Sequence, residues 1–332
     1  MSHRSTAHVQ ARISLGLVAL SVAGLALASP ALAAKKGRIA FQAYAGDLPQ
    51  VFTIKPDGTG QKQLTHVKGD PQKSPGAENP AWAPDGSKIA FDTGDDHSGV
   101  NLFTVPAEGG AITQIPLGLF MFNGDPGYSP GGSMISFDED SGPGQAPVHG
   151  IFIANADGTG GRQLTTAPDV KDAYDTQSQW SPDGKWIAFT RVKRVHRAAV
   201  YVIRVDGTGL KRLTAPRFDA GNPDWSPDGS KILFNSHFDP RRRQSANVYW
   251  MRPDGSHKTE LTHNARGKGQ SWGPAWSPDG KRIVFTKFTP IGKKDGRVDI
   301  YTMTPKGTAL KRVTHMPQAF TNNADWGPAP HS

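Results

Sequence analysis

One recurring phrase constrains the fold of this chain more than any other feature. An aromatic residue precedes a turn of the Ser-Pro-Asp-Gly type and a short aliphatic strand, as in NPDWSPDGSKILF at residues 222–234. The isoleucine of that strand recurs about every fifty residues, at Ile39, Ile89, Ile135, Ile187, Ile232 and Ile283. Self-similarity at such a period is typical of propellers and other repeat proteins.

Each repeat contains four short segments with the composition of β-strands, rich in β-branched and aromatic residues and bounded by Gly, Pro and Asp. No segment has the pattern of a helix. In the recurring turn, Pro presets φ and Gly takes the left-handed position, which joins two antiparallel strands tightly. We expect the repeat aromatics to be structural: Trp82, Tyr128, Trp180, Trp225, Trp276 and Trp326.

Six such units predict an all-β fold, a six-bladed β-propeller of four-stranded blades over residues 38–330, because stacked sheets bury faces that one sheet leaves exposed. The repeats start near residues 38, 88, 134, 186, 231 and 282. The first repeat has no aromatic strand before it, and the strand of Trp326 has no partner after it. We therefore expect the C-terminal Trp326 strand to pair with the first N-terminal strand and close the ring.

Residues 1–33 have the pattern of a secretory signal peptide, with basic residues, an apolar run and the A-x-A site Ala31-Leu32-Ala33. A short linker follows at residues 34–37. A retained membrane anchor is the alternative, but the run is short for a span and contains Pro30. The sequence predicts a secreted or periplasmic protein of the cell envelope, with no integral membrane segment after cleavage. The chain has no cysteine, which excludes disulfides and thiol catalysis.

The segment PAWSPDGKRIVF at residues 274–285, followed by DIYTM, a Gly turn and RVT, resembles the TolB-type propeller repeat (PD40, also called WD-repeat-like). The resemblance covers essentially all of the chain after the leader and implies a propeller fold much more specifically than a function. The unit of Tyr128 departs from the pattern, with Tyr for Trp and Gly131 for Asp. TolB itself carries an additional N-terminal α/β domain, which we expect to be lacking here.

The formal net charge of +9 becomes +7 when Arg4 and Arg12 leave with the signal peptide. A basic protein favours anionic partners. The alternative explanation is that the positive charge only keeps the protein soluble. An exported location argues against nucleic acid. We expect a monomer that binds a protein or peptide partner or an anionic cell-envelope polymer.

The candidate ligand-binding residues lie on one rim, in loops that vary between repeats, and binding residues generally lie in such loops. These loops are acidic in the second and third units and basic in the fourth to sixth. Arginine forks suit carboxylate and phosphate groups, and apolar residues could line the axial mouth. Exposed charged loops and core packing are the structural alternatives. The candidates are Arg191, Arg194, His196, Arg197, His237, Arg241, Arg242, Arg243, Lys293, Phe120, Phe122 and Trp272.

Clustered oxygens also raise the possibility of a Ca²⁺ site at Asp95, Asp96, Asp138 and Asp140. The spacing does not match an EF-hand loop and the two acidic groups lie on different blades, so solvated acidic loops are the favoured reading and no cofactor is expected. The histidines His97, His149, His196 and His237 fall on the same rim without the spacing of a zinc site. Ser129 lies in a G-x-S-x-G pattern, but a strand follows it where a nucleophile elbow needs a helix.

The sequence predicts a non-catalytic propeller that binds its partner at the variable-loop face and the axial mouth. The alternative is an enzyme, a metal-assisted lyase or lactonase that uses His and Asp residues of the rim. Convergence of His and carboxylates would favour the enzyme.

Overall fold

The computed structural model describes residues 37–69, 76–95, 99–118, 122–140, 149–168, 173–193, 197–236, 245–265, 267–291, 295–316 and 321–328. Of Asp95, Phe122 and Asp140 it describes the backbone only. The predicted signal peptide and residues 34–36 of the predicted linker lie outside these ranges.

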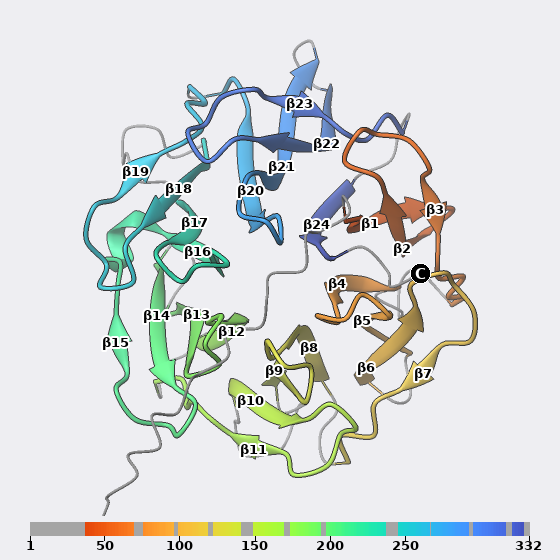
Figure 1. Cartoon of the computed structure of the whole chain (residues 1–332), viewed down its shortest axis with the longest axis vertical. Helices are drawn as coiled ribbons and strands as arrows, with labels where there is room; N and C mark the ends of the chain where they lie inside the picture. Colours follow the sequence, from red (N-terminus) through yellow and green to blue (C-terminus); the bar gives the residue numbers. More distant parts are fainter. Residues whose placement is uncertain are drawn as a thin grey trace, which may run out of the picture. The chain divides into compact units, whose positions relative to one another are not determined.

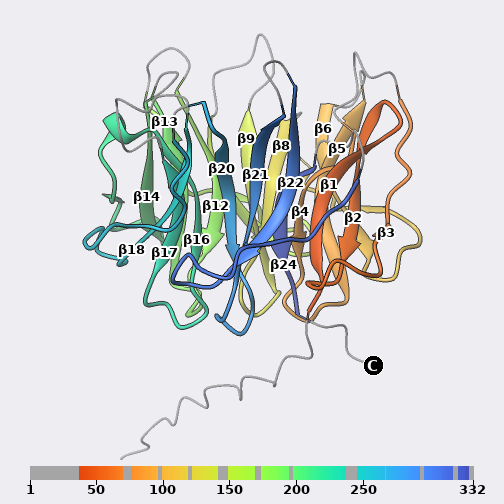
Figure 2. The same cartoon turned by 90° about the horizontal axis from the view of Figure 1, so that it is seen from above.

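Six four-stranded blades surround a central axis (Figure 1). In each blade the four strands lie side by side in order from the axis outwards, and Figure 2 shows the same strands from the side. This confirms the predicted six-bladed propeller. From the innermost strand outwards, blade 1 consists of β24 (Thr321–Trp326), β1 (Ile39–Ala45), β2 (Leu48–Ile54) and β3 (Lys62–Gln63), and blade 2 of β4 (Glu78–Trp82), β5 (Lys88–Asp95), β6 (Gly99–Pro106) and β7 (Thr113–Gln114). In the same order, blade 3 consists of β8 (Phe122–Tyr128), β9 (Met134–Asp140), β10 (His149–Asn155) and β11 (Arg162–Gln163), and blade 4 of β12 (Tyr174–Trp180), β13 (Trp186–Val192), β14 (Ala198–Arg204) and β15 (Lys211–Arg212). Blade 5 consists of β16 (Ala220–Trp225), β17 (Ile232–Ser236), β18 (Asn247–Met251) and β19 (Thr259–Glu260), and blade 6 of β20 (Gln270–Trp276), β21 (Ile283–Ile291), β22 (Asp295–Met303) and β23 (Lys311–Arg312).

The ring closes within blade 1, where the last strand of the chain pairs with the first. β24 runs antiparallel to β1, with Trp326 opposite Ile39 and Thr321 opposite Ala43. The predicted closure by the Trp326 strand is therefore confirmed. Blades 2 and 3 share one further bridge, between Val100 of β6 and Phe122 of β8. Within the described residues the one helical element is a short 3₁₀ turn, η1 (Pro216–Phe218).

Hydrogen bonds within the turns explain why Ser, Asp and Gly recur in the repeated phrase. In blade 4 the Ser181 carbonyl accepts from the Gly184 N–H at 2.8 Å, and Gly184 has the positive φ that the turn requires. The Asp183 carboxylate accepts from the Ser181 hydroxyl and the Lys185 N–H, at 2.6 and 3.1 Å. Ser129 occupies the same place in blade 3, where its Oγ accepts from the Met134 N–H at 3.0 Å. It is therefore a turn residue between two strands, as the sequence indicated.

The hydrophobic core lies between neighbouring blades, and each blade contributes one aromatic pair at the same place. The Phe of the second strand contacts the ring opposite it in the third strand, with centroids 5.4 to 6.1 Å apart. The rings are stacked in Phe41–Phe52, Phe91–Phe103, Phe137–Phe152, Phe189–Tyr201 and Phe234–Tyr249, and tilted in Phe285–Tyr301. The repeat isoleucine beside each pair is fully buried. Trp82, Trp180, Trp276 and Trp326 are buried, whereas Tyr128 and Trp225 are half-buried.

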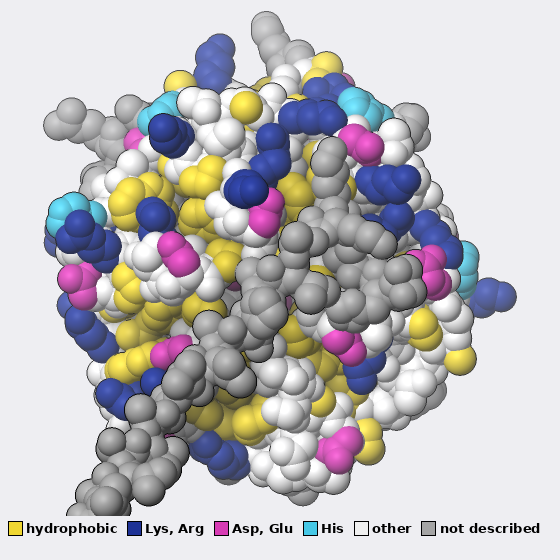
Figure 3. Space-filling model, in the orientation of Figure 1, with side chains coloured by type: hydrophobic (Ala, Val, Ile, Leu, Met, Phe, Trp, Pro, Cys, Tyr) yellow, Lys and Arg dark blue, Asp and Glu magenta, His cyan; other side chains and the backbone are white. Residues whose placement is uncertain are grey.

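Basic residues of the outermost strands form hydrogen bonds to neighbouring blades at the circumference. Lys62, Lys211 and Lys311 each donate to a carbonyl in the Gly turn of the next blade, those of Glu108, Asp254 and Asp57. Arg162 makes the same contact with the Val205 carbonyl. Figure 3 shows Lys and Arg side chains around the outer part of one face. Part of the basic charge of the protein therefore has a structural role.

Candidate functional site

The innermost strand of every blade is interrupted by a β-bulge. The pairing with the second strand shifts at this point in all six blades. The residue at each bulge has positive φ, between 46° and 57°, which Asn, Asp and Gly tolerate better than other residues. We call these six residues the bulge ring: Asn79, Asp125, Gln177, Asn222, Gly273 and Asn323.

Side chains of the preceding blade bind the backbone N–H groups that the bulges release. Gln42 Oε1 accepts from the Asn79 N–H at 3.0 Å, and Asp92 Oδ2 accepts from the Asp125 N–H at 3.1 Å. Asn235 Oδ1 accepts from the Gly273 N–H at 3.2 Å. The bulge ring therefore connects the blades around the axis, and satisfies groups that would otherwise be unpaired.

We expect the left-handed conformation, more than the side chain, to determine which residues fit the ring. At Asn222, whose N–H donates to Gln177 Oε1 at 3.0 Å, Asn222→Gly should change the free energy of unfolding by less than about 0.5 kcal/mol. Asn222→Val should lower it by about 1–3 kcal/mol, because a β-branched residue is strained at φ 52°. Urea unfolding followed by tryptophan fluorescence measures both. Equal losses in the two variants would contradict this explanation.

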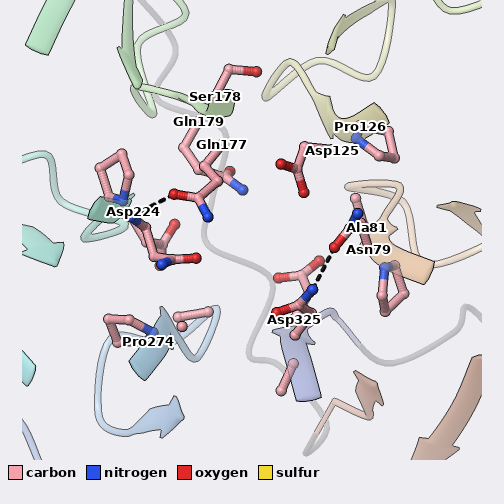
Figure 4. A pocket seen from close by; sticks show the side chains of 17 residues that line it. Asn79, Ala81, Asp125, Pro126, Gln177, Ser178, Gln179, Asp224, Pro274 and Asp325 are labelled. Carbon is pink, nitrogen blue, oxygen red and sulfur yellow. Dashed lines mark hydrogen bonds between the residues drawn. The ribbon is translucent and has the colours of Figure 1, made fainter. Parts of the chain in front are cut away.

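The six inner strands enclose an axial pocket of about 210 Å³ (Figure 4). Its lining residues precede the aromatic residue that ends each inner strand, so the pocket lies in the half of the channel nearer the Ser-Pro-Asp-Gly turns. The lining residues are Asn79, Pro80, Ala81, Asp125, Pro126, Gln177, Ser178, Gln179, Asn222, Pro223, Asp224, Gly273, Pro274, Ala275, Asn323, Ala324 and Asp325.

The pocket is acidic although the protein is basic. Asp125, Asp224 and Asp325 approach it from three sides, and none of the described lining residues is Lys or Arg (Figure 4). Asp224 Oδ2 accepts from the Trp276 N–H at 2.6 Å, and Asp325 Oδ2 accepts from the Trp82 N–H at 2.7 Å. These are contacts between neighbouring blades, so both carboxylates also hold the ring together.

Burial and mutual repulsion make these carboxyl groups unusually weak acids. Burial raises the pKa of Asp224 to about 8, and the charge of Asp325 contributes. Burial raises the pKa of Asp325 to about 6. Behind the lining, burial and the charge of Asp125 raise the pKa of Asp92 to about 7. The channel therefore becomes negatively charged as pH rises through these values, and no Lys or Arg of the described lining compensates that charge.

Among the predicted ligand-binding residues, Arg191 has a structural partner. Its guanidinium makes two contacts with the Asp175 carboxylate, Nε–Oδ1 at 2.6 Å and Nη2–Oδ2 at 2.7 Å, and a third with the Thr166 carbonyl at 3.0 Å. It also lies over the rings of Phe189 and Tyr201. The side chain is buried, which favours an ion pair of the fold over an anion-binding role.

The other predicted ligand-binding residues are only partly described. Arg197 is exposed, and the Trp272 indole N–H donates to Asn322 Oδ1 at 2.7 Å. Neither lines the axial pocket. Phe122 begins β8, and its side chain lies outside the described residues. Arg194, His196, His237, Arg241, Arg242, Arg243, Lys293 and Phe120 lie outside the described residues.

The predicted calcium residues are also only partly described. Asp138 Oδ2 of β9 lies 3.2 Å from Thr176 Oγ1. Asp95 and Asp140 lie in strands, but their side chains, like the whole of Asp96, are outside the described residues. Among the residues that the structure describes, no group of three or more His, Asp or Glu residues has the arrangement of a metal site.

Sequence reasoning missed the bulge ring and the carboxylates of the pocket. The available signal was positional: three residues before each repeat aromatic stands Asn, Asp, Gln, Asn, Gly or Asn. All but the Gln belong to residue types that favour positive φ. The predicted axial mouth was placed at the variable-loop rim, whereas the pocket lies toward the opposite rim.

Family comparison agrees with the architecture. The model of the TolB beta propeller domain (PD40) matches residues 18–196 and 179–287. The chain is similar to the uncharacterized protein Atu1656 of Agrobacterium fabrum, with 27% identity over 213 residues that cover 63% of this chain and 69% of the relative. It is also similar to the uncharacterized peptidase YuxL of Bacillus subtilis, with 26% identity over 216 residues. That match covers 54% of this chain but 32% of YuxL, so the chain spans about a third of that relative.

Solved structures show the same fold at lower identity. A putative TolB from Agrobacterium tumefaciens has a TM-score of 0.62 at 20% identity and covers 88% of this chain and 99% of its own. TolB from Acinetobacter baumannii has a TM-score of 0.68 at 20% identity, covering 88% of this chain and 67% of its own. An oligogalacturonate lyase in complex with manganese has a TM-score of 0.52 at 16% identity, covering 85% and 75%. Within the described ranges, no helix is long and apolar enough to cross a bilayer.

Proposed function

Because this chain belongs to the TolB β-propeller domain family, we propose that it is an exported, non-catalytic propeller that binds a protein or peptide partner in its axial channel. The family match supports the earlier resemblance and leaves the partner open, since one propeller fold serves many functions. The leader pattern of residues 1–33 and the likeness to TolB structures support an envelope location.

The observation that carries the proposal is the charge of the axial pocket. Three carboxyl groups, which ionise as pH rises, and several amide oxygens line it, without Lys or Arg among the described lining residues. Such a lining favours a cationic group, the side chain of Lys or Arg or an amino terminus, because the partner supplies the missing opposite charge. An anionic envelope polymer would meet repulsion in this pocket. The basic loops that would bind such a polymer lie largely outside the described residues.

A panel of probes tests the proposal by isothermal titration calorimetry, at a pH above the pKa of Asp325, which is about 6. We expect a short Lys/Arg peptide with blocked ends to bind, and an acidic peptide and oligogalacturonate not to bind. Asp325→Asn should weaken the cationic peptide by about tenfold or more, because hydrogen bonds to charged groups contribute about 1.5–3 kcal/mol. Asp228→Asn, a change in an exposed turn, is the matched control and should leave the affinity unchanged.

Three outcomes would contradict the proposal. Binding of oligogalacturonate alone would support an anionic polymer as the ligand. Cleavage of oligogalacturonate on addition of Mn²⁺ would support the alternative of a metal-assisted lyase. An affinity for the Lys/Arg peptide that Asp325→Asn and Asp228→Asn lower equally would place the peptide outside the channel.

A further inference from the structure

A single hydroxyl group lies between two carboxyl groups at the seam of blades 3 and 4. Thr176 Oγ1 of β12 is 2.7 Å from Asp125 Oδ2 of β8 and 3.2 Å from Asp138 Oδ2 of β9. A hydroxyl has one proton and can donate fully to only one acceptor. Because Asp125 is the nearer acceptor, the Thr176 hydroxyl donates its proton to Asp125. The contact with Asp138 is then favourable if Asp138 is a neutral acid that donates its own proton to Thr176 Oγ1.

The second oxygen of Asp138 also favours the neutral acid. Asp138 Oδ1 is buried and has no hydrogen-bond partner among the described residues. It lies near the backbone of Gly124, where an added Cβ would be 3.6 Å from it. An ionised carboxylate would leave an anionic oxygen without a donor, and burial of an unpaired charge is strongly unfavourable.

The groups around this pair are mainly acidic. The charges of Asp125 and Asp92 act on Asp138 in the same direction as its burial, and together they raise its pKa well above the usual range. Burial likewise raises the pKa of Asp125. The other titratable or charged side chains that the structure describes on these and the adjoining strands include Glu78 on β4, Lys88 on β5, Tyr128 on β8, Glu139 on β9, His149 on β10, Tyr174 and Asp175 on β12, Arg191 on β13, and Asp224 on β16. Asp175 is engaged with Arg191, and Lys88 lies over the Tyr128 ring at 5.9 Å.

We propose that Asp138 and Asp125 share a proton through Thr176, which joins blades 3 and 4 and makes the charge of the axial channel depend on pH. The part that concerns a bound cationic peptide rests on the proposed function; the shared proton does not. At low pH the pair keeps its proton and the seam is intact. As pH rises, Asp138 ionises, the seam weakens and the channel becomes more negative.

The sign of the pH effect follows from proton linkage. In the unfolded chain Asp138 ionises near its ordinary pKa of about 3.9, whereas the folded pair keeps the proton to higher pH. The folded state therefore binds more protons above that value, and the stability that they contribute is lost as pH rises through the raised pKa. Affinity for a cation changes in the opposite direction and increases with pH.

Infrared spectroscopy of the ligand-free protein tests the shared proton directly. Between about pH 5 and about pH 8, the wild-type protein should lose intensity in the C=O band of protonated carboxyl groups. Asp138→Asn should remove part of this loss and flatten the dependence of the melting temperature on pH, because an amide N–H donates to Thr176 at every pH. Thr176→Ser, which keeps the hydroxyl, should behave as the wild type. Asp228→Asn is the control.

Each result decides the proposal. The same band loss and the same melting profile in Asp138→Asn as in the wild type would overturn it. If Asp138→Asn does not fold, Thr176→Val provides the second test, since loss of the bridging hydroxyl should also reduce the band change. An unchanged band in Thr176→Val would likewise overturn the shared proton.

A second measurement separates this inference from the proposed function. The Lys/Arg peptide with blocked ends keeps its charge over this pH range, and its affinity for the wild type should rise about threefold or more from about pH 5 to about pH 8. In Asp138→Asn the rise should be smaller. A band change without any peptide binding would leave the shared proton intact and refute the proposed function alone. Peptide binding without a band change would do the reverse.

Discussion

Arg191→Met should lower the free energy of unfolding by about 3–5 kcal/mol, because it leaves the Asp175 carboxylate buried without its counter-charge. The Asp175 side chain is 0% exposed and that of Arg191 is 8% exposed, so water cannot replace the lost partner. Thr165 Oγ1 still donates to Asp175 Oδ2 at 2.6 Å, but one neutral donor does not balance a buried anion. Chemical denaturation at neutral pH measures the loss.

Two further variants make this prediction specific to the buried ion pair. Arg191→Met combined with Asp175→Asn should recover most of the loss, because removal of both charges eliminates the unpaired anion. Lys185→Met removes the ammonium of an exposed pair with Asp183, whose nitrogen and oxygen are 3.9 Å apart, and should change stability by less than about 0.5 kcal/mol. A loss in the double variant as large as that in Arg191→Met would mean that packing, not charge, is the cause.

Trp326→Ala should lower the free energy of unfolding by about 3–5 kcal/mol, the usual range for truncation of a large buried aromatic side chain. Trp326 is 8% exposed and lies in a core cluster with Ile39 and Phe41 of blade 1 and with Val284 and Ile300 of blade 6. The change therefore weakens the cluster that holds β24 between two blades. Thermal and urea unfolding both measure it.

Hydrogen exchange gives this prediction an internal control. In Trp326→Ala, amides of β1 should exchange faster, because β24 is the inner neighbour of β1. Amides of β13 in blade 4 should keep their protection. Trp326→Phe should show a smaller loss of the same kind. Faster exchange throughout the ring would contradict a local role for Trp326.

The fold was predictable because its determinants are local and repeated. The Ser-Pro-Asp-Gly turns, the left-handed glycines and the paired aromatics each act within one blade, and six copies make the pattern visible in one sequence. The threonine that follows the outermost strand is a further example. Thr214 Oγ1 accepts from the Val200 N–H at 2.9 Å, in place of the next bond of the strand ladder.

The candidate site was much less predictable, because each blade contributes one or two residues to it. Asp125, Asp224 and Asp325 are about a hundred residues apart in sequence, and the bulges that orient their strands depend on side chains of the preceding blade. The ion pair of Arg191 was not predictable for a related reason. Its partner Asp175 precedes it by 16 residues, and only the pairing of β12 with β13 shows that the two side chains meet.

Net charge was also a poor guide to the channel. The value of +9 counts lysines such as Lys62 and Lys211, whose ammonium groups bind turn carbonyls at the circumference. The axial pocket has the opposite sign. A formal charge sums over the whole surface, so it does not give the local field in a channel.

The pairing of β24 with β1 has a consequence for the order in which the molecule assembles. Five blades consist of strands that follow one another in sequence, so each can form by successive hairpins with short loops. Blade 1 joins Ile39 to Trp326, and its inner strand can be added only when both ends of the propeller sequence meet. Because long loops are entropically costly to close, we expect this junction to form last and to open first. The ring is thus completed by its least local contact, which we expect to set the slow step of folding and the starting point of unfolding.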